Sequence, residues 1–216
     1  MIEYVDNNCY DSKVANTNLT AAGYAKIEQS TAANISFTEL YAPLINAAPL
    51  QGERIVCTMP INAESALLIG ALHKLGAEVR VCASSTTNTD DDVAAALAAN
   101  GVAIFAWNNE AWAEYWWCMM KAFSFANNLL PTLLIDPYGK ASRAISIGAN
   151  GEADPALLQS ITDTDEGLEL SEMIYMSHLS GMVWGKIATA IEQTINTPET
   201  ISDCLTKILS YATQKK

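Results

Sequence analysis

Short apolar runs alternate with longer amphipathic stretches through the middle of the chain. The apolar runs are typical of buried strands and span residues 53–58, 77–83, 102–107 and 131–136. Between them, apolar residues recur at helical spacing over 63–76, 89–101 and 109–126. Because a helix separates each pair of strands, the strands are predicted to run parallel. The pattern therefore predicts an α/β fold with a short, doubly wound, Rossmann-like parallel sheet.

Helical patterns also flank this central alternation. Residues 14–47 predict one or two helices, and 166–195 predict a long helical stretch interrupted near Gly181–Gly185. Thr197-Pro198-Glu199 is a helix-start signal for a last helix that ends near residue 212. Residues 137–160 show a less regular pattern.

These patterns suggest a division of the chain into two parts. Residues 1–165 are expected to form the main domain, and 166–216 a helical extension that packs on it. Thr89 is the expected N-cap of the helix over 89–101, since threonine is favoured there and acids follow it.

Composition and charge narrow the class of protein. Of the 216 residues, 50% are hydrophobic and 17% charged, which suits a globular domain with a sizeable core. The net charge of −12 disfavours binding to nucleic acid or to an anionic membrane. The N-terminus has no signal-peptide pattern, and no apolar run reaches the roughly 20 residues that span a bilayer. We expect a cytoplasmic protein. The five cysteines are widely spaced without a CxxC pair, so neither a disulfide framework nor a metal site is expected.

Polar residues cluster directly after each predicted strand, where open parallel sheets bind ligands. The four clusters are Met59 to Asn62 with Glu64, Ser84 to Thr89, Trp107 to Glu110, and Asp136 to Lys140. Neutral donors and acceptors with one or two carboxylates suit a polyhydroxyl or nucleoside ligand. Each cluster also has a simpler interpretation: Thr89 as a helix cap, Glu64 as a first-turn acid, Asp136 as a turn opener and Trp107 as a packing residue.

The sequence contains neither a glycine-rich phosphate loop nor a nucleophile elbow. Acid/base chemistry by Asp136, assisted by Tyr138, Lys140 or Asp163, is the catalytic option that the residues suggest. Thr89 and Trp107 are added as substrate-binding candidates because they belong to the second and third clusters.

Residues 52–123 resemble the substrate domain of S-adenosylhomocysteine hydrolase. The most specific pieces are LGAEVRVC, the acid-rich run that ends in VAAAL, and AW-x-x-E-x-x-x-EYWWC. VANTNLTAAG at 14–23 looks like that family's opening segment, and TLLID at 132–136 like the strand before its catalytic aspartate. The resemblance covers roughly residues 12–175 and thins after 136.

The resemblance implies roles for several residues. Glu64 matches the glutamate that reads the adenine edge, Asn62 an adenine-side threonine, and Met59 an apolar residue against the base. Asp136 matches an active-site aspartate, and Asp163 takes the place of a ribose-holding glutamate. Two departures stand out. Pro60 occupies the position of an active-site histidine, and the family's NAD domain is missing, so no cofactor is expected.

Three hypotheses follow. The first is an enzyme that binds S-adenosylhomocysteine, S-adenosylmethionine or another small metabolite and performs redox-free acid/base chemistry: elimination, addition, isomerisation or cyclisation. The second is a non-catalytic protein that binds or senses an adenosine-type ligand. The third is a hydrolase subunit whose NAD domain comes from a separate chain. The helices over 167–212 are expected to cover the pocket or to form a homo-oligomer interface.

Overall fold

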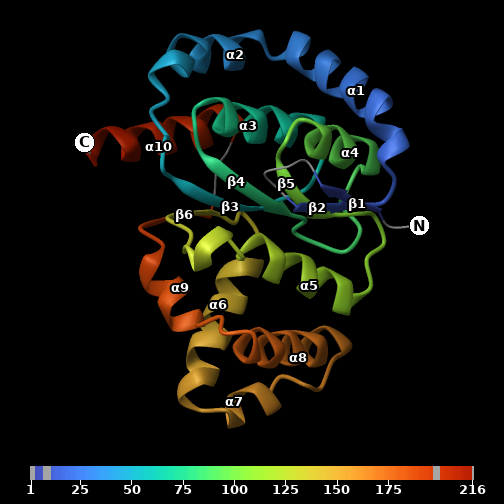
Figure 1. The fold of residues 1–216 in the computed structure, drawn as a ribbon, viewed down its shortest axis with the longest axis vertical. Helices are drawn as coiled ribbons and strands as arrows, with labels where there is room; N and C mark the ends of the chain where they lie inside the picture. Colours follow the sequence, from blue (N-terminus) through green and yellow to red (C-terminus); the bar gives the residue numbers. More distant parts are fainter. Residues whose placement is uncertain (1–2, 7–10, 197–199, 216) are drawn as a thin grey trace.

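The computed structural model describes residues 3–6, 11–196 and 200–215, which build one seven-stranded sheet (Figure 1). The spatial order is β1-β2-β5-β4-β3-β6-β7; six strands run parallel, and β1 pairs antiparallel with β2 at one edge. The strands are β1 (Glu3–Asp6), β2 (Asp11–Val14), β3 (Arg54–Thr58), β4 (Glu78–Cys82), β5 (Ala103–Ala106), β6 (Leu133–Ile135) and β7 (Gln193–Ile195). The predicted Rossmann-like α/β fold is confirmed.

Helices cover both faces of the sheet. In Figure 1 the upper layer holds α1 (Thr20–Ala33), α2 (Ile35–Tyr41), α3 (Ala63–Lys74), α4 (Asp91–Ala99) and α10 (Ile201–Gln214). The lower layer holds α5 (Trp112–Ala122), α6 (Lys140–Ala153), α7 (Ala156–Gln159), α8 (Asp165–Leu179) and α9 (Trp184–Ala190). Short 3-10 turns lie at η1 (Thr17–Leu19), η2 (Ala42–Ala47) and η3 (Ala126–Asn128).

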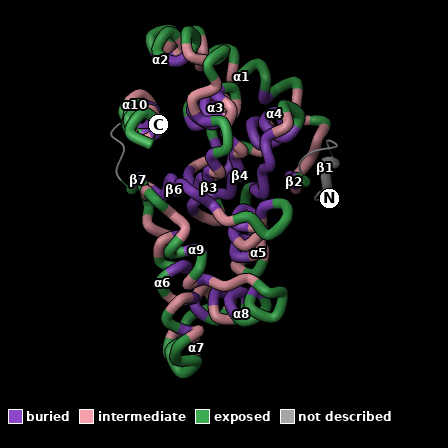
Figure 2. Tube along the Cα trace, turned by 60° about the vertical axis from the view of Figure 1, so that its left-hand side comes forward, coloured by how far each residue is buried: buried purple, intermediate pink, exposed green. Residues whose placement is uncertain are grey.

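The core lies on both sides of the sheet. In β3, Ile55 and Cys57 pack into the upper apolar cluster, whereas Val56 packs into the lower one. Strands covered on both faces have few solvent-facing positions, so their sequences read as continuous apolar runs. Figure 2 shows this arrangement, with buried residues concentrated in the sheet and along the inner sides of the helices. None of the described helices is both long and apolar enough to cross a membrane.

The structure corrects several local predictions. β7 lies inside the stretch 166–195 that was predicted to be helical, although the predicted interruption near Gly181–Gly185 is confirmed by the break between α8 and α9. β2 was assigned to no element. Both are strands of three or four residues near the edges of the sheet, with polar positions, DSKV and QTI, and are too short for a period-two pattern to register. The less regular segment 137–160 contains the 14-residue helix α6.

One predicted helix start differs from the structure, and another falls on residues that the structure does not describe. α4 begins at Asp91 with Asp90 as its N-cap, so the prediction of Thr89 as N-cap is wrong; Thr89 instead pairs with Ile61 in an isolated parallel bridge. The start signal at 197–199 lies outside the described residues. The described helix α10 has Thr200 as its N-cap, and the Thr200 hydroxyl accepts from the Asp203 amide at 3.1 Å.

The strand order places a topological switch point between β3 and β6. From β3 the chain continues through β4 and β5 on one side, and then crosses to β6 and β7 on the other. Two neighbouring strands whose connections leave in opposite directions open a crevice at their carboxyl ends, where open α/β sheets bind ligands. We therefore looked for the functional site there.

Candidate functional site

A cleft of about 230 Å³ occupies this switch point. Three segments line it: the turn after β3 with the start of α3, the turn after β6, and the start of α10. Its residues are Met59, Pro60, Asn62, Glu64, Ser65, Leu68, Pro137, Tyr138, Thr200, Ile201 and Cys204. The cleft thus brings together four of the residues singled out from sequence: Met59, Asn62, Glu64 and Tyr138.

Backbone and side-chain hydrogen bonds hold the turn after β3. The Asn62 side-chain oxygen accepts from the Ser65 amide at 2.9 Å, and the Ser65 hydroxyl accepts from the Asn62 amide at 3.0 Å. This reciprocal capping box starts α3. The Ile61 amide donates to the Asn88 carbonyl at 2.9 Å, which ties the turn to the loop after β4. The Asn62 oxygen is therefore occupied by the fold, and only its NH₂ group remains to meet a ligand.

Glu64 differs from its neighbours because its carboxylate is not bonded to any described residue. It lies in the first turn of α3, is exposed, and makes no hydrogen bond or ion pair with any residue that the structure describes. Met59, only 6% exposed, supplies an apolar surface to the same cleft. An open carboxylate beside an apolar wall can accept N–H groups from a flat, partly apolar ligand.

Asp136 is placed differently. Its side chain is fully buried and is not among the residues that line the cleft. One oxygen accepts from the Thr58 hydroxyl at 2.7 Å and the Ala141 amide at 3.3 Å, and the other from the amide and hydroxyl of Ser142, both at 2.7 Å. The carboxylate therefore anchors the start of α6 to the end of β3. Its role in proton transfer stays a prediction.

Among the described residues, none of the three expected helpers of Asp136 forms a hydrogen bond or an ion pair with it. Lys140 Nζ donates to Glu166 Oε1 at 2.8 Å, and Arg143 Nη1 donates to the same oxygen at 3.1 Å. Tyr138 is 65% exposed at the rim of the cleft. Asp163 is exposed in the turn before α8 and does not line the cleft. The sequence alone does not single out Glu166, because helical spacing does not show that the start of α8 faces the start of α6.

Thr89 and Trp107 are buried and lie outside the cleft lining. The Thr89 hydroxyl has no hydrogen-bond partner among the described residues, and the Trp107 amide donates to Glu110 Oε1 at 3.1 Å. Burial of Glu110 raises its pKa to about 8, although the Trp107 amide opposes the shift. The structure therefore places a buried acid behind the loops after β4 and β5.

The start of α10 supplies three lining residues that the sequence analysis did not identify: Thr200, Ile201 and Cys204. Burial raises the pKa of the Cys204 thiol to about 12, so the thiol stays protonated at neutral pH and is a poor nucleophile. No motif marks such residues, because they reach the cleft only through the packing of α10 on α3.

The starts of α3, α6 and α8 do not fit the pyrophosphate of a dinucleotide. Such a group binds to free amides at a helix N-terminus behind a glycine-rich turn. Here side chains already accept from those amides: Asn62 at α3, Asp136 at α6 and Thr164 at α8. The turn after β3 contains no glycine. We therefore derive no step through NAD.

The fold is a Rossmann-like α/β domain with a cleft at the switch point of its sheet. The family model of S-adenosyl-L-homocysteine hydrolase matches residues 11–210. The chain belongs to that family.

Proposed function

We propose that the cleft binds an adenosine-type nucleoside, or a small metabolite that carries one. The unpartnered Glu64 carboxylate at the switch point is the observation that carries this proposal. Membership of the hydrolase family supports it, since that family's substrate contains adenosine.

The lining residues suggest how such a ligand would be held. Glu64 would accept N–H groups from the edge of the base, while Met59 and Leu68 would pack against its face. Tyr138 and the Asn62 NH₂ group lie in the same cleft and would meet the sugar hydroxyls. The start of α10 would form one wall beside them.

Redox-free acid/base catalysis is the second candidate function. One observation favours it: Glu64 is a carboxylate that opens into the cleft, and no described cation pairs with it. Binding is placed first because the other predicted acid, Asp136, already accepts four hydrogen bonds inside the protein.

Calorimetry with adenosine tests the binding proposal. Removing Glu64 as Glu64→Ala should weaken binding by about 1–3 kcal/mol, because the polar edge of the base would lose its partner. Glu28→Gln, an exposed acid on α1 outside the cleft, is the matched control and should leave affinity unchanged. No heat of binding to the wild type at millimolar adenosine would refute the proposal.

Mass spectrometry of ligands released from the purified protein separates the remaining hypotheses. An adenosine-type compound is the expected result. Dinucleotide released in stoichiometric amount, or hydrolase activity that appears only when a second chain is added, would instead support the hypothesis of a separate NAD-binding subunit.

A further inference from the structure

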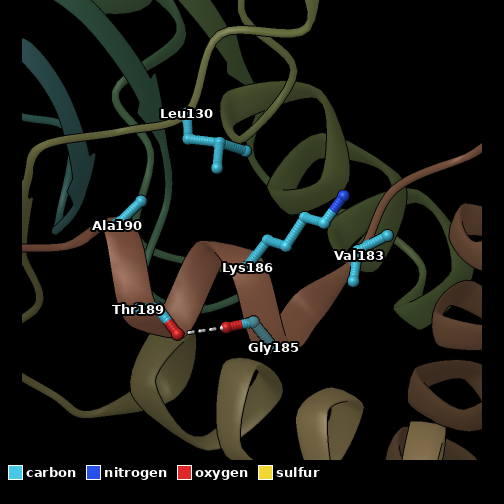
Figure 3. Close-up of a pocket in the computed structure, with 6 residues that line it drawn as sticks. All are labelled: Leu130, Val183, Gly185, Lys186, Thr189 and Ala190. Carbon is cyan, nitrogen blue, oxygen red and sulfur yellow. Dashed lines mark hydrogen bonds between the residues drawn. The ribbon is translucent and has the colours of Figure 1, made fainter.

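A second concave site lies at the opposite edge of the sheet. Leu130 precedes β6, and Ala190 precedes β7, so this groove borders the amino ends of both strands. Two adjoining hollows of about 480 and 540 Å³ form it and share Leu130, Val183 and Lys186. Figure 3 shows Leu130 facing the side chain of Lys186 on α9, with Val183 and Ala190 at either end.

Apolar and polar groups both line the groove. Its partly exposed apolar side chains are those of Leu130, Met182 and Val183, which lie over the buried Phe123 and Phe125. Two of its hydroxyls already donate within the protein, because Ser124 donates to the Met120 carbonyl and Ser180 to the Ser177 carbonyl, at 2.8 and 2.7 Å. The groove therefore offers some apolar contact area, and these two serines do not offer their protons to a ligand.

The charge of the groove is opposite to that of the protein as a whole. The chain carries 24 acidic residues, yet none of them is among the described residues that line the groove. Lys186 lines both hollows, and its side-chain ammonium forms no hydrogen bond or ion pair with any described residue. The acid that approaches α9, Glu152, accepts from the backbone amides of Trp184 and Gly185.

We propose that this groove binds a small amphipathic anion, a free carboxylate with an apolar chain of about six to ten carbons. The apolar chain would lie against Leu130, Met182 and Val183, where burial of each methylene is favourable. The carboxylate would meet the Lys186 ammonium at the rim. In an acidic protein, an apolar groove with a single available cation selects against cationic ligands and in favour of anionic ones.

Calorimetry with octanoate tests this proposal, with octan-1-ol as the uncharged comparison. Octanoate should bind more tightly than octan-1-ol. Lys186→Gln should weaken octanoate binding about two- to fivefold, as expected for an exposed ion pair, and should abolish the preference over the alcohol. Lys74→Gln is the matched control, because Lys74 is an exposed lysine on α3 outside the groove.

A pair of variants at Val183 provides a sharper test. Val183 is the N-cap of α9 but provides no side-chain cap, and both Asp and Asn are favoured at that position. Val183→Asp and Val183→Asn should therefore both fold. The Asp variant adds a negative charge beside Lys186 and should weaken octanoate binding about two- to fivefold more than the Asn variant.

Two results would overturn the proposal: no octanoate binding at 5 mM, or octanoate binding that Val183→Asp and Val183→Asn reduce equally. Saturating adenosine should not change octanoate affinity, because the two sites share no lining residue. This independence separates failure of the groove from failure of the nucleoside cleft.

Discussion

The cleft after β3 and β6 and the groove before β6 and β7 lie at opposite edges of one sheet, and their chemistry differs accordingly. At the carboxyl edge, the helices that follow the strands begin, and their first amides need acceptors. Asn62 and Asp136 provide these acceptors at α3 and α6. At the amino edge, α5 ends and loops return to the strands, and apolar side chains such as Leu129 and Leu130 line the surface there beside polar groups.

The charges that remain open also differ. The cleft presents the Glu64 carboxylate, and the groove presents the Lys186 ammonium. At the carboxyl edge most of the polar side chains named above form hydrogen bonds within the protein. The residue that points to a ligand is the one whose side chain has no such bond to a described residue. This distinction separates Glu64 from Asp136, although both are acids that follow a strand.

The largest expected effect is the loss of folding stability when the Asp136 side chain is removed. Asp136→Ala would take the acceptor from the amide and hydroxyl of Ser142 and from the Ala141 amide, and would leave the Thr58 hydroxyl only its longer contact to the Ile135 carbonyl at 3.3 Å. The free energy of unfolding should fall by about 2–5 kcal/mol, because each donor that loses its acceptor costs about 1–3 kcal/mol. Urea denaturation measures it.

Glu64→Ala is the control at the same edge and should change stability by about 1 kcal/mol or less. Asp136→Asn, which keeps the shape, tests the catalytic prediction. If the folded Asn variant binds adenosine normally but has lost turnover of an identified substrate, Asp136 acts in catalysis as well as in the fold.

How well the sequence predicts the strands and helices depends on the region of the chain. Strands β3 to β6 and their helices were predictable because buried parallel strands, such as the one around Val56, read as apolar runs between amphipathic helices. The short strands β2 and β7 were not, because both carry polar residues. β7 lies at the edge of the sheet, and β2 pairs with β5 over only two residues. Their place depends on pairing with distant segments.

The candidate site was predictable to the same extent. Met59, Asn62 and Glu64 follow β3 directly, so strand order alone places them at the carboxyl edge. The contribution of α10 was not visible, because Cys204 reaches the cleft through tertiary packing. Nor does the sequence show that the Asp136 carboxylate points into the protein, since this depends on where α6 begins relative to β3.

Glu110 extends the comparison to a buried acid of the carboxyl edge. The folded protein holds its proton up to about pH 8, whereas an unfolded chain releases it near pH 4.3. Between these values the folded state binds more protons, so the free energy of unfolding should decrease as pH rises, by at most about 1.4 kcal/mol per pH unit. Above pH 8 this contribution should level off.

The Glu110→Gln variant should lose this part of the pH dependence, which denaturation from pH 5 to 9 would measure. Glu28→Gln, an exposed acid on α1, should retain the wild-type slope. Parallel pH profiles for the wild type and Glu110→Gln would contradict the expected burial effect.

The smallest expected effect concerns the helix that walls the cleft but not the groove. The Thr200 hydroxyl accepts from the Asp203 amide and donates to the Asp203 carboxylate at 2.8 Å, which fixes the first turn of α10. Thr200→Ala should therefore lower stability by about 1 kcal/mol, while Thr200→Ser keeps the hydroxyl and should retain most of that stability.

Because Thr200 and Ile201 line the cleft, a loosened first turn should also weaken adenosine binding about two- to fivefold, roughly 0.5–1 kcal/mol. Octanoate affinity should stay at the wild-type value, since α10 contributes nothing to the groove. An equal loss at both sites in calorimetry would mean that Thr200 acts through general destabilisation, and that the two edges of the sheet are energetically coupled.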